Sequence, residues 1–265
     1  MFTHVVSISY FTRDGNGFAP GEEAVGPWAP DMLHGRLFGG LAARALEMEF
    51  LKPGWRVSRL TVDMFRPAGF ELTEVSTALV RQGRRIIVAD AMVTVGGVEV
   101  ASVRAIALSE GTPPPGQIWQ APRWESPPPD SLPRIENPRA EPRTEDPVWD
   151  IRIHEGGIYD DGRSRVWTND HGHLVDDEPL TPLVRAALSG DLASPLSNGS
   201  AAGIGYINAD YTMAMARYPT GNWVGLETTT HLAADGIAVG ASTMYDENGP
   251  FGTSTTTALA NPMLQ

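Results

Sequence analysis

The sequence of 265 residues predicts an α+β fold in which one unit, a helix covering an antiparallel sheet, occurs twice. Two observations predict this fold. An apolar helical pattern followed by strand-like segments occurs in each half of the chain, and a proline-rich stretch separates the halves. We therefore expect a first unit over residues 1–112, a linker over 113–147 and a second unit over 148–265.

The spacing of apolar residues predicts one helix in each unit. In the first unit, near residues 38–50, a single face of the helix is apolar. The residues of this face are Leu37, Phe38, Leu41, Ala42, Ala45 and Leu46. The segment 182–189 repeats the spacing. Thr181 suits the N-cap there, Pro182 the first helical position and Gly190 the end of the helix.

Strand-like segments follow each helix. They cover residues 56–66, 72–82, 85–95 and 98–108 in the first unit and 205–217, 222–233, 236–247 and 250–260 in the second. Gly96-Gly97 and Asn248-Gly249 occupy matching places and are typical of hairpins. A further strand is expected before each helix, near residues 4–10 and 148–154. Pairing the two units edge to edge would protect their exposed edge strands.

The segment between the units is rich in proline. Residues 113–147 contain 11 of the 22 prolines of the chain. Proline lacks an N–H donor and fixes φ, so this segment cannot form a helix or a central strand. It is expected to be an extended linker, and Trp119 and Trp124 indicate that it lies along the surface of a unit.

Composition argues against several classes of protein. The net charge of −12 argues against a nucleic-acid partner, although a local arginine cluster can still bind a phosphorylated small molecule. The absence of cysteine excludes disulfides, a thiol nucleophile and cysteine-ligated zinc. No serine-elbow, P-loop or dinucleotide motif is present. With no signal peptide and no apolar run of about 18 residues, we expect a cytoplasmic protein without a membrane span.

Two polar groups suggest possible chemistry. His171 and His173 lie near acidic residues, but a solvated polar loop is the better interpretation, and we expect neither a metal nor an organic cofactor. Asp210 begins an otherwise apolar strand, where a carboxylate must be paired, hydrogen-bonded or functional. Threonines at 228–230 and 253–257 are either exposed strand residues or hydroxyl partners with which Asp210 deprotonates a water.

Several motifs resemble those of the bacterial acyl-CoA thioesterase II family and its actinobacterial relatives. In the first half they are Gly35-Arg36-Leu37-Phe38-Gly39-Gly40, Phe65-Arg66-Pro67 and Arg81-Gln82-Gly83-Arg84. In the second half they are Tyr206-Ile207-Asn208-Ala209-Asp210, Glu227-Thr228-Thr229 and Asp246-Glu247-Asn248-Gly249-Pro250. The resemblance implies a double hot-dog fold, a place in lipid metabolism, and hydrolysis of a fatty acyl-CoA to the free acid and CoA.

The resemblance also implies catalytic residues. The family orients the attacking water with an Asp, a Thr and a Gln. By position these are Asp210, Thr229 (with Thr228 one place away) and Thr257 or, after a one-residue shift, Thr256. Threonine departs from the family's Gln because a hydroxyl cannot present the fixed donor and acceptor of an amide. A non-catalytic acyl-CoA-binding protein is therefore one alternative.

Substrate-binding residues are expected in the first unit. Phe38-Gly39-Gly40 opens a helix, where backbone N–H groups favour a thioester oxyanion; the same glycines also suit close packing. Arg81 and Arg84 lie in a turn that could meet the phosphates of CoA or be a solvated charged turn. His34 is more typical of a capping or packing residue than of a substrate contact.

Two further expectations concern the whole chain. Aligning Arg66 with Arg217 places Arg59 opposite Asp210, so each chain is expected to have one active site. Open sheet edges and apolar outer surface predict a homo-oligomer. An enoyl-thioester hydratase is the second alternative function, and it should carry an Asp/His pair near the helix, whereas His34 has no Asp neighbour in the sequence.

Overall fold

The computed structural model describes residues 8–135 and 147–261. In the first half its elements are β1 (Ser9–Asp14), β2 (Gly17–Pro20), α1 (Arg36–Phe50), β3 (Trp55–Met64), β4 (Thr73–Gln82), β5 (Ile86–Val95) and β6 (Val98–Ser109). In the second half they are β7 (Trp149–Glu155), β8 (Arg165–Asp170), β9 (His173–Val175), α2 (Pro182–Gly190), α3 (Ala193–Asn198), β10 (Gly199–Ser200), β11 (Gly203–Ile204), β12 (Tyr206–Asn208), β13 (Asp210–Met215), β14 (Val224–Ala234), β15 (Ile237–Asp246) and β16 (Gly249–Ala260).

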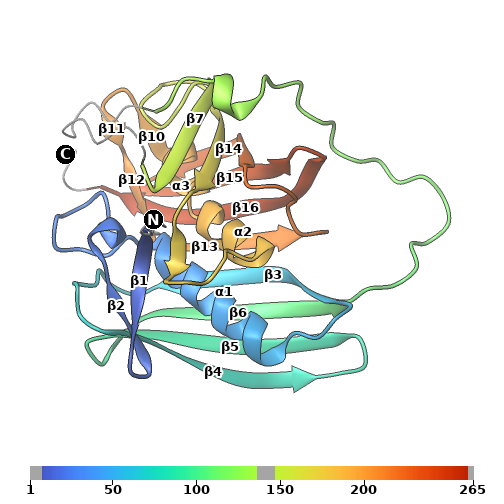
Figure 1. The fold of residues 1–265 in the computed structure, drawn as a ribbon. Helices are drawn as coiled ribbons and strands as arrows, with labels where there is room; N and C mark the ends of the chain where they lie inside the picture. Colours follow the sequence, from blue (N-terminus) through green and yellow to red (C-terminus); the bar gives the residue numbers. More distant parts are fainter. Residues whose placement is uncertain (1–7, 136–146, 262–265) are drawn as a thin grey trace, which may run out of the picture.

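The strands of both halves join into one curved sheet (Figure 1). Within the described residues it has 14 strands, in the order β7-β8-β14-β15-β16-β13-β3-β6-β5-β4-β2-β1-β9, with β12 paired to β16. Helices α1 and α2 pack against each other in front of the sheet. The predicted α+β class and the helix followed by antiparallel strands, present twice, are confirmed.

The two units meet where β3 pairs with β13. Thr61 lies opposite Thr212 at the centre of this antiparallel ladder, and their Oγ1 atoms are 3.1 Å apart. The alignment of Arg66 with Arg217 also makes Thr61 equivalent to Thr212. A pseudo-two-fold axis therefore passes between these two threonines. The same register places Asp210 opposite Asp63.

The second helix differs from the sequence prediction. Its start agrees, since the Thr181 hydroxyl accepts a hydrogen bond from the Val184 N–H (3.2 Å). However, the chain turns after Gly190 and forms a second helix, α3. Asp191 occupies this junction in a helical conformation, and its carbonyl accepts from the Ser194 N–H (3.1 Å). The helical layer of the second unit is therefore broken at an acidic residue.

The N-terminal and central parts of the chain contain strands that the sequence did not predict. Strand β1 overlaps the end of the expected strand at 4–10, of which residues 4–7 fall outside the described part. It continues into a hairpin with β2 that the sequence did not predict. The expectation of a polar loop at His171 and His173 is wrong for His173, which begins β9; only His171 and Gly172 lie between β8 and β9. Strand β9 pairs in parallel with β1, so the second half contributes an edge strand to the sheet of the first.

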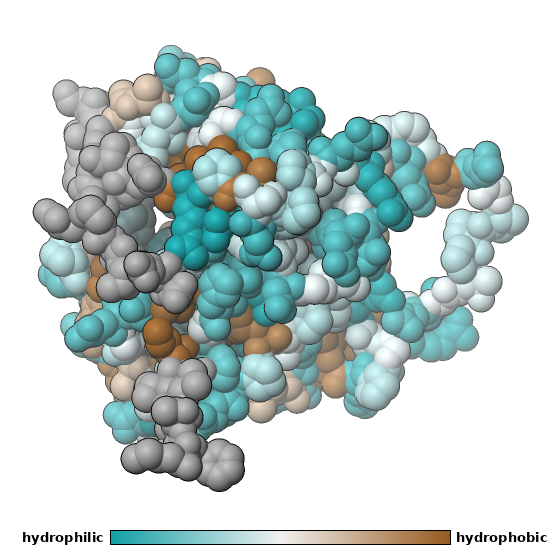
Figure 2. Space-filling model, turned by 45° about the horizontal axis from the view of Figure 1, so that its top comes forward, coloured by the Kyte–Doolittle hydropathy of each residue, from teal (hydrophilic) through white to brown (hydrophobic). Residues whose placement is uncertain are grey.

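The described part of the proline-rich segment, 113–135, follows the second unit only in places. Trp124 packs on Tyr245 with ring centroids 4.3 Å apart, whereas Trp119 is 82% exposed. Figure 2 shows the segment at the right standing away from a mostly hydrophilic face. Residues 136–146 lie outside the described part. The division into residues 1–112, 113–147 and 148–265 stays a prediction.

Candidate functional site

A buried carboxylate lies at the centre of the molecule, between α2 and α3. Asp191 is 8% exposed, and burial raises the pKa of its carboxyl above the ordinary value. Asn208 and the charge of Arg36 act against burial and lower this pKa in part. A carboxyl with a raised pKa is a better proton acceptor near neutral pH than an ordinary Asp.

Asn208 holds the Asp191 carboxylate. Its Nδ2 donates to Asp191 Oδ1 at 2.8 Å and to the Asp210 carbonyl at 3.3 Å. Among the described residues, no other side chain donates to the Asp191 carboxylate. One oxygen is therefore oriented by the protein, and the carboxylate retains capacity to accept a proton or a hydrogen bond from water.

Helix α1 packs directly on α2 beside this carboxylate. A Cβ on Gly39 would lie 1.8 Å from Tyr211 Oη, and one on Gly40 would lie 2.7 Å from Leu188. Tyr211 Oη donates to the Ala187 carbonyl on α2 (2.9 Å). Only glycine permits this approach of the two helices and β13.

The structure gives Phe38-Gly39-Gly40, the predicted oxyanion site, a role in helix packing. Helix α1 begins at Arg36, so Gly39 and Gly40 lie beyond the first turn, and their N–H groups are within reach of carbonyls of the helix itself. Phe38 is buried, and its N–H donates to the Gly35 carbonyl at 3.1 Å. The contacts show close packing at the glycines, the second of the two roles that the sequence suggested.

Asp210 and Thr257 are brought together. Asp210 Oδ1 accepts from the Thr257 N–H at 2.6 Å and from the Thr257 hydroxyl at 2.7 Å. Both side chains lie on the face of the sheet that points away from the helices, because their neighbours Tyr211 and Thr256 are buried on the helix side. Asp210 and Asp191 therefore lie on opposite faces of the sheet.

A one-residue irregularity explains this separation. Strand β12 ends at Asn208 and β13 starts at Asp210, so Ala209 falls between them. Its N–H donates to the Thr257 carbonyl at 2.9 Å. Such a bulge shifts the alternation of side chains. As a result Asn208 points to the helices and Asp210 away from them.

Thr229 is not near Asp210. Strands β16 and β15 lie between β13 and β14, and Thr229 is exposed at a bulge of β14, where its hydroxyl donates to the Ala241 carbonyl (3.2 Å). The expected contact between Thr229 and Asp210 is therefore not formed. Thr228, the neighbouring candidate, donates to the Leu196 carbonyl in α3 at 3.3 Å.

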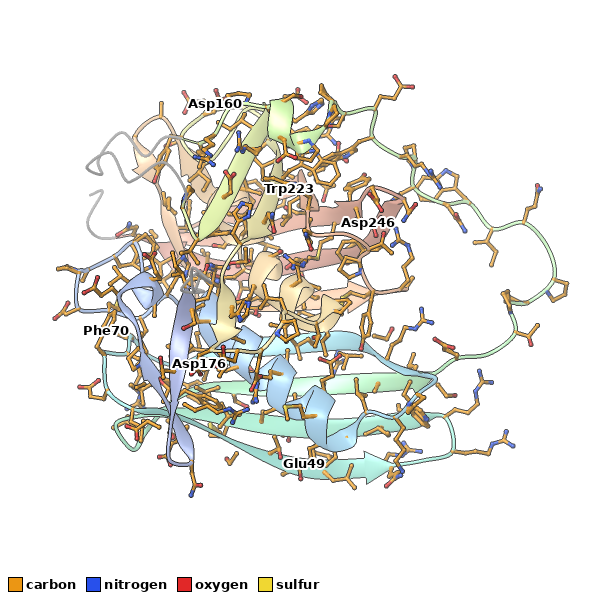
Figure 3. All side chains as sticks on the ribbon, in the orientation of Figure 1. Glu49, Phe70, Asp160, Asp176, Trp223 and Asp246 are labelled. Carbon is orange, nitrogen blue, oxygen red and sulfur yellow. The ribbon has the colours of Figure 1, made fainter. Side chains whose placement is uncertain are left out.

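The arginine turn lies at the far end of α1. Arg81 and Arg84 flank the exposed turn between β4 and β5. Further up β4, Thr77 donates to Glu49 near the C-terminal end of α1 (2.5 Å; Figure 3). A helix of 15 residues is about 22 Å long, so the length of α1 separates this turn from the Asp191 region.

The remaining sequence candidates have structural partners. His34 lies edge-on to Trp149 (5.3 Å between ring centroids), and burial together with the nearby Arg36 lowers its pKa to about 3, which leaves it neutral.

In residues 8–135 and 147–261, no group of three or more His, Cys, Asp and Glu side chains is arranged to bind a metal. Within the same residues, no helix has the length and apolar character needed to cross a membrane.

One cavity of about 380 Å³ lies between the linker and the second unit. Trp124, Trp167, Trp223, Tyr245 and Asp246 contribute to its lining. Figure 3 labels Trp223 and Asp246 on this side of the molecule. None of the catalytic or substrate-binding residues predicted from the sequence lines this cavity.

Sequence reasoning missed Asp191 and Asn208. The signal for Asp191 was present, because it is a lone acid between the apolar segments Ala186-Ala187-Leu188 and Leu192-Ala193. This is the same argument that singled out Asp210. For Asn208 we see no signal beyond its place in the motif Tyr206-Ile207-Asn208-Ala209-Asp210.

Comparison with known families covers most of the chain. Residues 24–108 match the family described as acyl-CoA thioesterase N-terminal domain, and residues 113–260 match its acyl-CoA thioesterase C-terminal domain. No curated protein matches the sequence.

Solved structures with this fold are similar over nearly their whole length. A tesB protein of Mycobacterium avium subspecies paratuberculosis has 16% identity and a TM-score of 0.69, with 95% of this chain and 96% of that chain covered. A hot-dog protein of Alicyclobacillus acidocaldarius has 17% identity and a TM-score of 0.71, with 95% of each chain covered. An acyl-CoA thioesterase II of Mycobacterium marinum has 18% identity and a TM-score of 0.63, with 85% and 90% covered. At these identities the likeness establishes the hot-dog fold.

Proposed function

The chain belongs to the acyl-CoA thioesterase family, and we propose that it hydrolyses a fatty acyl-CoA to the free acid and CoA, with Asp191 activating the attacking water. Membership of the family indicates a thioester hydrolase. The observation that carries the assignment to Asp191 is its burial beside the contact of α1 with α2, with Asn208 as its one side-chain donor among the described residues.

The proposed reaction needs no group beyond water and the side chains of the chain. Asp191 takes a proton from the water, whose oxygen attacks the carbonyl carbon of the thioester. The tetrahedral intermediate then expels the CoA thiolate as the C–S bond breaks, and the proton held by Asp191 passes to the sulfur. The thioester oxyanion would lie toward the N-terminal end of α1, where the helix dipole supplies partial positive charge.

Asp210 is the alternative base. Thr257 supports it as a partner through two hydrogen bonds of 2.6 and 2.7 Å. These bonds already use Oδ1, and the carboxylate faces away from the helices. We therefore favour Asp191 as the base and keep Asp210, with Thr257 as its partner and Thr229 as a more distant hydroxyl on the same sheet, as the second proposal.

The substrate is proposed to run along α1. A narrow apolar crevice between the C-terminal half of this helix and the sheet would receive the acyl tail, and its lining includes Leu46, Phe50, Ala105 and Ala107. The phosphates of CoA would reach toward the positive turn of Arg81 and Arg84. Arginine is well suited to phosphate because it donates paired hydrogen bonds.

The chain is also proposed to self-associate. Exposed apolar side chains cluster on the outer face of the second unit, where Leu232 pairs with Val239 and Ile237 pairs with Leu259 across strands. Exposed apolar patches of this kind commonly mark interfaces. Light scattering should give a mass above that of the 28.5 kDa monomer at micromolar concentrations; a monomer mass would contradict this proposal.

Assays distinguish two alternative functions, a hydratase and a non-catalytic binding protein, from the proposed thioesterase. An enoyl-thioester hydratase needs an acid–base pair, but no carboxylate among the described residues bonds His34, which packs on Trp149. A non-catalytic binding protein would bind acyl-CoA without turnover. Thiol release measured over acyl-CoA substrates of increasing length should show turnover. Hydration of an enoyl-CoA, or binding with no released thiol, would support one of the alternatives instead.

A further inference from the structure

A buried ion pair ties the start of α1 to the second half of the chain. Arg36 is 1% exposed, and its guanidinium donates to both oxygens of Asp170, from Nη2 at 2.7 Å and from Nη1 at 3.1 Å. Tyr10 closes the network, since its hydroxyl donates to Asp170 (2.6 Å) and accepts from Arg36 Nη2 (2.5 Å). The guanidinium also lies 4.0 Å from the centre of the Trp149 ring.

This network joins four segments that are far apart in the sequence. Tyr10 comes from β1, Arg36 from the first turn of α1, Trp149 from β7 and Asp170 from the end of β8. A buried ion pair is poor evidence of stabilisation, because removing two charges from water costs about as much as their attraction returns. Its geometric requirement is strict, however, so the pair fixes where α1 begins relative to the second unit.

The turn of α1 that follows Arg36 makes the contact with the candidate site. Gly39, three residues on, lies against Tyr211, whose hydroxyl bonds Ala187 in α2. Gly40 lies against Leu188, three residues before Asp191. The ion pair and the proposed base are therefore connected through one packed contact between the two helices.

We propose that Arg36 and Asp170 act as a positioning pair, which holds the first turns of α1 on α2 and sets the net charge that the Asp191 carboxylate experiences. The inference rests on the proposed function of Asp191. Arg36 and Asp170 are not catalytic residues in this proposal, because they act through the helix contact and through the electric field.

The charges make opposite predictions for the two members of the pair. The Arg36 cation lowers the pKa of Asp191 against the larger effect of burial, so loss of the cation raises this pKa. Asp170 partly cancels the cation, so loss of its charge leaves Arg36 unopposed and lowers the pKa of Asp191. In a plot of kcat/KM against pH, the acid limb would move to higher pH in the first case and to lower pH in the second.

Other polar and titratable groups near Arg36, Asp170 and Asp191 do not obscure the acid limb of the pH profile of kcat/KM. Around Arg36 and Asp170 these groups are Tyr10, His34 and Arg185, and around Asp191 they are Asn208 and Tyr211. The pKa of His34 is lowered to about 3 by burial, and burial raises the pKa of both tyrosines. Burial raises the pKa of the Asp191 carboxyl toward this limb, whereas it moves the pKa values of His34 and both tyrosines away from neutrality.

The test compares Asp170→Asn with the double variant Arg36→Met/Asp170→Leu in the full chain, using thiol release from an acyl-CoA. The double variant leaves no unpaired buried charge, so it should fold even if Asp170→Asn, which leaves Arg36 unpaired, does not. Both variants should lower kcat about 10- to 100-fold, because misplaced groups lose turnover. The acid limb should shift to lower pH for Asp170→Asn. For the double variant, which removes both charges, it should shift by a smaller amount to higher pH, because Arg36 acts on Asp191 more strongly than Asp170 does.

Asp246→Asn is the matched control. Asp246 is 3% exposed and also forms an ion pair with arginine, accepting from Arg217 Nη2 at 2.7 Å. It lies at the opposite end of the second unit from β12 (Asp246 in Figure 3, β12 in Figure 1). It should lower thermal stability and leave the acid limb in place. Acid limbs that stay in place, or that shift in the same direction, in the Asp170 and double variants would overturn the positioning proposal. Full activity of Asp191→Asn would instead contradict the proposed base.

Discussion

Asn208 donates its side-chain amide to Asp191 across 2.8 Å, and this bond joins the short strand β12 to the break between α2 and α3. The bond reaches the carboxylate on the side of the sheet that α1 and α2 cover. Asn208 of β12 therefore orients the carboxylate of Asp191, which lies among packed helices.

Replacing Asn208 should weaken catalysis in a way that depends on pH. Asn208 lowers the pKa of Asp191, so Asn208→Leu should raise this pKa and move the acid limb of kcat/KM to higher pH. Loss of orientation should also reduce kcat by about tenfold or more. Steady-state thiol release between pH 4 and 8 measures both effects. An unchanged limb would mean that Asn208 does not act on the titrating group.

Asp191 should reduce the stability of the parent protein at neutral pH. Its pKa is raised in the folded state, so the folded protein binds the proton to higher pH than the unfolded chain, where an Asp titrates near pH 4. Stability is therefore lost as the pH rises from about 4 through the folded pKa. Asp191→Asn should raise the melting temperature by a few degrees at pH 7.

That stabilisation should shrink as the pH falls to about 4 and below, because Asp191 then becomes protonated in the unfolded chain as well as in the folded protein. Thermal unfolding of the two proteins at pH 4 and pH 7 gives the comparison. If Asp191→Asn were less stable than the parent at pH 7, the folded protein would stabilise the ionised carboxylate, contrary to the raised pKa.

Gly39→Ala should disturb the contact between α1 and β13. The added Cβ would lie 1.8 Å from Tyr211 Oη and 2.9 Å from its Cζ. Overpacking of this kind typically costs about 1–3 kcal/mol of the free energy of unfolding. Adding Tyr211→Phe, which removes the nearer atom, should recover part of this loss in urea denaturation. No difference between Gly39→Ala and the parent would contradict the packing role of this glycine.

Arg81→Ala/Arg84→Ala should raise KM for acyl-CoA several-fold while leaving kcat nearly unchanged, since the turn would bind phosphate away from the reacting carbon. The effect should weaken with added salt, because both arginines are exposed. The same acyl group on pantetheine, which lacks the nucleotide phosphates, is the control substrate and should show no change. An equal rise of KM for both substrates would remove the turn from CoA binding.

The sequence predicted those parts of the fold that local patterns determine. Helix α1 and the hairpins at Gly96-Gly97 and Asn248-Gly249 follow from apolar spacing and turn residues that lie next to one another. The match between Arg66 and Arg217 led to a pseudo-symmetry that the pairing of Thr61 with Thr212 reproduces. These features do not depend on how distant segments pack.

The site depended on features that local patterns do not encode. The bulge at Ala209 decides which of Asn208 and Asp210 faces the helices, and no residue there signals a bulge. The burial of Asp191 depends on tertiary contacts, which include its hydrogen bond with Asn208 of β12. Thr229 was chosen from a run of strand threonines and from the resemblance, and the strand order separates it from Asp210 by two strands.

The most direct test of the account measures thiol release from an acyl-CoA by Asp191→Asn and Asp210→Asn, two substitutions that are chemically identical and lie on opposite faces of one sheet. Asp191→Asn should reduce kcat by about 10²-fold or more with little change in substrate affinity, a typical share for a positioned base, whereas Asp210→Asn should stay close to the parent. Parental turnover in Asp191→Asn, together with a loss in Asp210→Asn, would contradict the account and assign the base to Asp210.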